Sequence, residues 1–196
     1  MTEPENATSG QIHATSIMMV LLLAGISTLF LGASAAYLYT RFTTGITAPY
    51  PPVLFYLNIP ILFLATRHLR KVRNLGDALG DPAAPRHLAV TLVLTLVFVL
   101  LQVIGWLLFF DAERSIGSTQ SMSYLFLLSG LHLAHVLAGF PFLVVLIRRQ
   151  KRFIPDLLSP PVKLRRYVWA VTLYWNFLDV LWILLVILLT ASALLS

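Results

Sequence analysis

Residues 174–182 read Tyr-Trp-Asn-Phe-Leu-Asp-Val-Leu-Trp and place one carboxylate, Asp179, in an otherwise uncharged run that extends from residue 168 to residue 196. This run is longer than the roughly 20 apolar residues that a helix needs to cross a bilayer. A carboxylate inside such a helix is costly, so it normally faces a protein interior and has a polar partner. We therefore expect Asp179 to lie within a membrane bundle and to pair with a side chain of another helix.

Composition places the whole chain in a membrane. Hydrophobic residues make up 58% of the 196 positions and charged residues 11%, whereas a soluble domain has about half and about a quarter. Cysteine is absent, which excludes disulfides, thiolate-bound zinc and iron–sulfur clusters. We expect an all-α integral membrane bundle of five transmembrane helices. The expected spans are residues 14–40, 50–66, 88–110, 124–147 and 168–195.

The basic residues indicate how the bundle is oriented. Residues 67–87 and 148–166 hold twelve of the fourteen Lys and Arg residues, so the positive-inside rule puts both connections in the cytoplasm. The amino terminus is then cytoplasmic and the carboxy terminus periplasmic. The net charge of +6 is explained by this topology and does not indicate nucleic-acid binding.

The first apolar stretch is too long for the core of a signal peptide, so we expect it to be a retained helix. No connection between the spans is long enough to fold alone. Residues 1–196 are therefore expected to form a single membrane domain.

Two histidines in the fourth expected helix are the candidate partners of Asp179. His132 and His135 are three residues apart and share one helix face. At 1.5 Å per residue, His135 lies about 17 Å from the outer end of its helix and Asp179 about 17 Å from the inner end of the next. We expect a hydrogen bond from Asp179 to His135, by depth, or to His132, by the shared face. Asn176 is expected in the same polar cluster.

Two histidines and one carboxylate also match a type of iron site, and a proton relay is a third possibility. The metal site is disfavoured because membrane metalloenzymes usually need more ligands. A relay needs a continuous line of polar groups, and these helices offer few.

Small residues at four-residue spacing predict close helix packing. Membrane helices associate through backbone approach and interhelical hydrogen bonds, because lipid is as apolar as their side chains. One row lies in the first expected helix and one in the fourth, and together they favour a tight bundle. The rows are Ala24, Thr28, Gly32 and Ala36, and Gly130, Ala134 and Ala138.

Ordered landmarks along the chain carry a family resemblance. Residues 174–182 are similar to the signature Tyr-Trp-His-Phe-Val-Asp-Val-Val-Trp, and residues 129–139, Ser-Gly-Leu-His-Leu-Ala-His-Val-Leu-Ala-Gly, to Thr-Gly-Phe-His-Gly-Leu-His-Val-Ile-x-Gly. Weaker landmarks are residues 35–38, Leu57 with Asn58, and Gln102 with Trp106. In this order they resemble the heme-copper oxidase subunit III family, the third core subunit of cytochrome c and quinol oxidases. The resemblance covers nearly the whole chain and fits the five-helix form of many bacterial oxidases.

The resemblance implies an accessory subunit of a respiratory terminal oxidase in the bacterial inner membrane, serving aerobic electron transport. Such a subunit packs against catalytic subunit I and other subunits of the respiratory complex, and it holds phospholipids in its clefts. It has no redox centre, so haem and copper are expected in the partner subunits and no cofactor in this chain.

Three positions depart from the family pattern. Ile26 and Gly105 stand where the family has membrane glutamates, and Asn176 stands for a histidine. A proton-related role that rests on the first glutamate is therefore in doubt for this chain.

Two alternatives stay open at this point. One is a subunit III-like component of a nitric oxide reductase or another respiratory complex. The other is a stand-alone membrane enzyme or transporter built around His132, His135 and Asp179. A transporter normally has internal repeats and broken helices, and the five unequal segments show no duplicated pattern.

Overall fold

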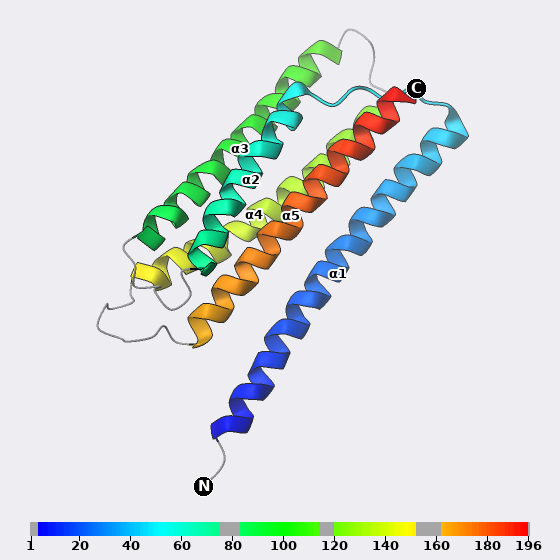
Figure 1. Cartoon of the computed structure of the whole chain (residues 1–196). Helices are drawn as coiled ribbons and strands as arrows, with labels where there is room; N and C mark the ends of the chain where they lie inside the picture. Colours follow the sequence, from blue (N-terminus) through cyan, green and yellow to red (C-terminus); the bar gives the residue numbers. More distant parts are fainter. Residues whose placement is uncertain (1–3, 75–82, 114–119, 152–161, 196) are drawn as a thin grey trace.

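The computed structural model describes residues 4–74, 83–113, 120–151 and 162–195, and the regular structure in these ranges is α-helical (Figure 1). It confirms the expected all-α membrane bundle. Four helices, all except α2, are long and apolar enough to cross a membrane. α2 is less apolar because its last two turns carry four basic residues. The helices are α1 (Pro4–Thr44), α2 (Val53–Asn74), α3 (Ala83–Glu113), α4 (Gln120–Lys151) and α5 (Val162–Leu194).

The connection between α1 and α2 follows from its glycine and prolines. Gly45 has a φ of 63° and its N–H donates to the carbonyl of Arg41 over 3.0 Å, which is the left-handed cap that often ends a helix. The prolines up to Pro52 cannot donate backbone hydrogen bonds, and α2 begins directly after them. The N–H of Phe55 then donates to the carbonyl of Pro52 over 2.9 Å.

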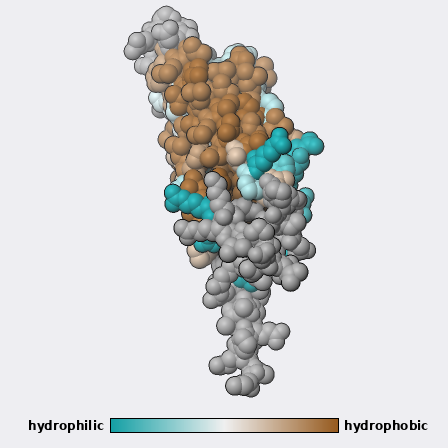
Figure 2. Space-filling view, turned by 90° about the vertical axis from the view of Figure 1, so that its left-hand side faces the viewer, coloured by the Kyte–Doolittle hydropathy of each residue, from teal (hydrophilic) through white to brown (hydrophobic). Residues whose placement is uncertain are grey.

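Helices α2 to α5 form the body of the bundle, and α1 lies along one side of it (Figure 1). The most extensive contacts join α2 to α3, followed by those of α5 with α2 and α4. α1 touches α4 and α5 more sparingly. Figure 2 shows a broad apolar surface over one face, with hydrophilic side chains gathered at its edge. This is the surface expected of a bundle that is surrounded by lipid.

Trp182 of α5 lies at the centre of the body. Its ring is fully buried, and its centroid is 5.1 Å from that of Phe55 in α2 and 5.3 Å from that of Phe98 in α3. The ring of His132 in α4 lies 4.9 Å away. Trp182 Nε1 also donates to the carbonyl of Phe55 over 3.2 Å. One side chain therefore joins four helices by packing and one hydrogen bond.

Candidate functional site

Asp179 faces α2, and the predicted hydrogen bond to a histidine of α4 is wrong. Its half-buried carboxyl lies beside the side chain of Thr66 and within the electrostatic influence of the positive charge of Arg70, both in α2. Among the described residues, neither Asp179 Oδ1 nor Thr66 Oγ1, both buried, has a hydrogen-bond partner. The helix rotation explains the difference. Depth along two helices sets which residues are level, but not which neighbour a face of α5 turns toward.

The α5 face that includes Asp179 is bonded to α2 along its length. Arg70 donates from Nε to Asn176 Oδ1 over 2.8 Å, and its Nη2 donates to the same oxygen. The amide nitrogen Nδ2 of Asn176 donates to the carbonyl of Thr172 over 2.8 Å. At the other end of this face, the hydroxyls of Tyr56 and Thr190 lie 2.7 Å apart. Asn176 therefore links α5 to α2 through its hydrogen bonds with Arg70.

The two histidines of α4 sit in different surroundings. His132 is fully buried among the rings of Phe30, Phe98 and Trp182, and neither of its ring nitrogens has a hydrogen-bond partner among the described residues. His135 is half-buried, and its Nδ1 pairs with the carbonyl of Leu131 in its own helix over 2.7 Å. Neither histidine therefore joins Asp179 in one site.

Gly139 marks a close approach of α4 and α5, and its position in the sequence did not identify it as a packing residue. A Cβ built on Gly139 would lie 2.8 Å from Trp175 Cη2 and 2.9 Å from Tyr174 Cε1. The Tyr174 hydroxyl donates to the carbonyl of His135 over 2.7 Å, so the tyrosine is also held in place. This contact is hard to predict from the sequence, because it forms between two helices whose relative placement is known only from the structure.

The row of small residues in α1 does not pack against the body of the bundle. All four of its side chains are exposed, and the buried side chains of α1 are instead Ile26, Phe30, Tyr37 and Arg41. The prediction that this row packs within the chain is therefore wrong. The row consists of Ala24, Thr28, Gly32 and Ala36.

The row in α4 is also turned mostly outward. Ala134 and Ala138 are exposed, and only Gly130 approaches a neighbour, at 3.7 Å from a Trp106 ring carbon to a Cβ built on it. Repeated small residues mark a face for close approach, but the repeat does not tell whether its partner is in the same chain.

One of the two positions at which the family has a glutamate has a packing explanation. Gly105 is buried, and a Cβ there would lie 3.4 Å from Phe55 Cε1. A glutamate at this position would have to displace the ring. Ile26 is buried as part of the apolar core.

Two apolar clefts lie between α1 and the body of the bundle. The first, of about 400 Å³, is lined by α1 residues that include Ser27 and Leu31 and by α5 residues that include Phe177. The second, of about 500 Å³, lies between Met18 and Leu22 of α1 and the side chains of Phe142 and Tyr174. Their linings suit hydrocarbon chains and offer almost no polar group.

Within the described ranges, no group of three or more His, Cys, Asp and Glu side chains is placed to hold a metal ion. The fold is an integral membrane helical bundle whose interior is held by aromatic packing and a few polar pairs. Residues 79–192, more than half of the chain, match the family model for cytochrome c oxidase subunit III, and the chain belongs to this family.

A relative named cytochrome c oxidase subunit 3, from Corynebacterium diphtheriae, is 33% identical over 110 residues. These cover 55% of this chain and 49% of the relative, so the chain spans about half of that relative's length. The region that matches the family model includes residues 174–182 and 129–139, the two segments that carry the resemblance in the sequence.

Proposed function

We propose that this chain is a redox-free accessory subunit of a respiratory terminal oxidase in the bacterial inner membrane. In this role it packs against the haem-bearing catalytic subunit I and prolongs that subunit's working life. The observation that carries the proposal, beside the family itself, is the outward row of α1. Small side chains on a membrane helix are expected where another helix approaches closely, and this row has no such neighbour in the described part of the chain.

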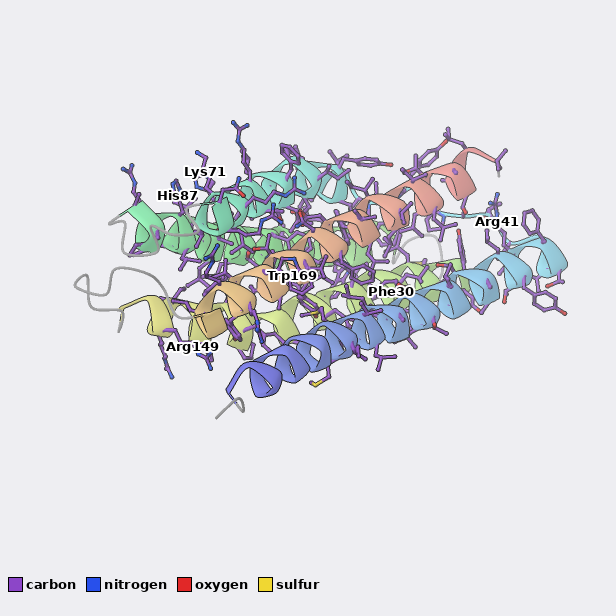
Figure 3. The ribbon with its side chains drawn as sticks, turned by 60° about the horizontal axis from the view of Figure 1, so that its bottom comes forward. Phe30, Arg41, Lys71, His87, Arg149 and Trp169 are labelled. Carbon is purple, nitrogen blue, oxygen red and sulfur yellow. The ribbon has the colours of Figure 1, made fainter. Side chains whose placement is uncertain are left out.

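The orientation is part of the proposal. Lys71, His87 and Arg149 lie at one end of the bundle and Arg41 at the other (Figure 3). The basic connections therefore start from the same end, which the positive-inside rule assigns to the cytoplasm. With α2 as a fifth crossing, the amino terminus is cytoplasmic and the carboxy terminus periplasmic.

Phospholipids are the proposed occupants of the two clefts between α1 and the body. The linings are almost wholly apolar, and the clefts open at the flank of a bundle whose surface is itself apolar. Acyl chains that fill them would replace missing protein contacts along α1. Haem and copper are assigned to partner subunits, as membership of the cytochrome c oxidase subunit III family implies.

The name of the relative, cytochrome c oxidase subunit 3, favours an oxidase over a nitric oxide reductase. The stand-alone enzyme or transporter has no observation in its favour, since His132 and His135 do not meet Asp179.

A substitution in the α1 row tests the proposed interface. Gly32→Leu adds a side chain where no described atom of another helix lies within 4 Å of the new Cβ, so the fold should tolerate it. Overpacking a close helix interface costs about 1–3 kcal/mol, which corresponds to about thirtyfold weaker association at the middle of that range.

The measurement is the haem that is recovered with the affinity-tagged chain in mild detergent. Val93→Leu is the control, since Val93 is exposed on α3 and is not part of the α1 row. Haem recovery that is equal for Gly32→Leu, Val93→Leu and the unchanged chain would contradict an interface along this row.

A further inference from the structure

We propose that His68 of α2 and His87 of α3 bind one divalent transition-metal ion of the copper(II) or nickel(II) type through their two Nδ1 atoms. The pair lies at the end of the α2–α3 contact that carries Lys71 (Figure 3). Both histidines are outside the polar contacts of Asp179 and outside the clefts of α1. The inference goes beyond the proposed function and does not depend on it.

The distance between the two rings carries the proposal. His68 Nδ1 and His87 Nδ1 are 2.9 Å apart, with ring centroids separated by 5.1 Å. Two nitrogens bonded at about 2.0 Å to one ion are about 2.8 Å apart at a right angle and about 3.3 Å apart at the tetrahedral angle. The observed spacing is close to the right-angle value, which is the geometry that copper(II) and nickel(II) prefer.

The backbone around the pair holds the two ligands at this spacing. The hydroxyl of Thr91, one turn beyond His87, donates to the carbonyl of His87 over 3.0 Å and lies 3.2 Å from the carbonyl of Ala65 in α2. Leu69 and Leu88, each next to one of the histidines, are fully buried. Ligands on two rigid, packed helices lose little freedom on binding, so the pair is preorganised.

Metal binding at this site requires only that a proton shift within one ring. In the free pair, one Nδ1–H donates to the other Nδ1. On metal binding this proton moves to the Nε2 of the same ring, which leaves two Nδ1 lone pairs for the ion. No oxidation or reduction is involved.

The two positive neighbours of His68 allow a test that distinguishes a cation site from an anion site. Lys71 and Arg67 are exposed and act on His68 electrostatically, so they repel a cation and weaken its binding. Removing one of these charges should therefore tighten metal binding. The same change would weaken the binding of a phosphate or a lipid headgroup. Water completes the coordination, because the pair supplies only two ligands.

The test is a copper(II) titration of the full chain in detergent, after treatment with a chelator, followed by electron paramagnetic resonance. We expect one ion per chain and electron spin-echo modulation from two imidazoles. His68→Asn and His87→Asn should each weaken binding at least tenfold, since each removes half of the chelate. His13→Asn, which removes a histidine of α1, should leave the affinity unchanged, and Lys71→Gln should tighten it several-fold.

Thermal unfolding without metal checks that each variant is folded, and the modulation pattern of the unchanged chain needs no variant. A pattern from one imidazole or none would overturn the proposal. So would equal copper affinity in the unchanged chain, His68→Asn and His87→Asn, or weaker binding in Lys71→Gln.

Discussion

Adding one methyl group at Gly139 should separate α4 from α5. The new Cβ would lie 2.8 and 2.9 Å from two ring carbons of Trp175 and 2.9 Å from one of Tyr174. Carbon atoms pack at about 3.5–4.0 Å, so each contact is too short by about 0.6 Å or more. Trp175 is 1% exposed, and Tyr174 is bonded to the His135 carbonyl, so neither ring can turn away freely. Overpacking of this kind costs about 1–3 kcal/mol, and three simultaneous contacts put Gly139→Ala near the upper value.

Gly130→Ala is the matched control on the same helix. Its Cβ would meet Trp106 at 3.7 and 3.8 Å, which is ordinary contact, and replacing a helical glycine by alanine gains about 0.5–1 kcal/mol. The same gain applies to Gly139→Ala, so it cancels in the comparison, and the two variants should differ by the overpacking cost of about 3 kcal/mol in the free energy of unfolding.

Circular dichroism during unfolding by dodecyl sulfate in mixed micelles measures that difference. Trp175→Phe, which removes the crowded end of the indole, should recover part of the loss in Gly139→Ala. A Gly139→Ala protein as stable as Gly130→Ala would refute the close approach of α4 and α5.

Three further predictions address the α2–α5 contact, the orientation and the acid response. In a mutant cycle, Arg70→Ala and Asn176→Ala should be non-additive by about 0.6–2 kcal/mol, the range of interhelical polar contacts in membranes; strict additivity would deny the bond. In intact cells, an impermeant thiol reagent should label Gly117→Cys and spare Gly76→Cys, and the reverse would refute a cytoplasmic amino terminus. Because the pKa of His68 is lowered on folding, the unfolded chain binds more protons as the pH falls through about 6.5, so stability is present above that pH and is lost below it. His68→Asn should lose less stability between about pH 7 and pH 5, measured with a chelator present, and identical pH profiles would contradict this.

The helices were predictable because composition and length decide them. A run of more than 20 uncharged apolar residues has few alternatives to a membrane helix. The same pattern placed residues 50–66 at a helix, although the structure extends α2 to Asn74 through its basic end. Helix formation there does not depend on apolar character, so hydropathy could not locate that end.

The partners of individual side chains were less predictable, because they depend on the rotation of each helix about its axis. Asp179 was expected at a histidine of α4 and lies beside Thr66 of α2. Level and charge were reasonable guides, but α5 has neighbours on two sides, and the sequence does not say which one a given face meets. Asn176 was expected in a cluster with the histidines of α4 and Asp179, whereas its hydrogen-bond partner is Arg70, which lies beyond the expected apolar span.

The spacing of small residues did not predict where helices pack closely within the chain. Gly32 and Ala36 have the spacing of a packing row and are exposed, whereas Gly139, outside either row, packs tightly against Trp175. Spacing identifies surfaces on which close packing is possible. The large ring on the opposing helix decides where it occurs, and it is known only once the helices are placed.

The most direct test of the accessory-subunit assignment is purification of the tagged chain from its own membranes in mild detergent, with a visible spectrum and identification of every co-purifying subunit. We expect a haem-bearing catalytic oxidase subunit in stoichiometric amount, and a partner that still transfers electrons but inactivates sooner when this chain is deleted. A chain that purifies without any haem-bearing partner, together with an oxidase whose assembly and working lifetime are unchanged by the deletion, would contradict it.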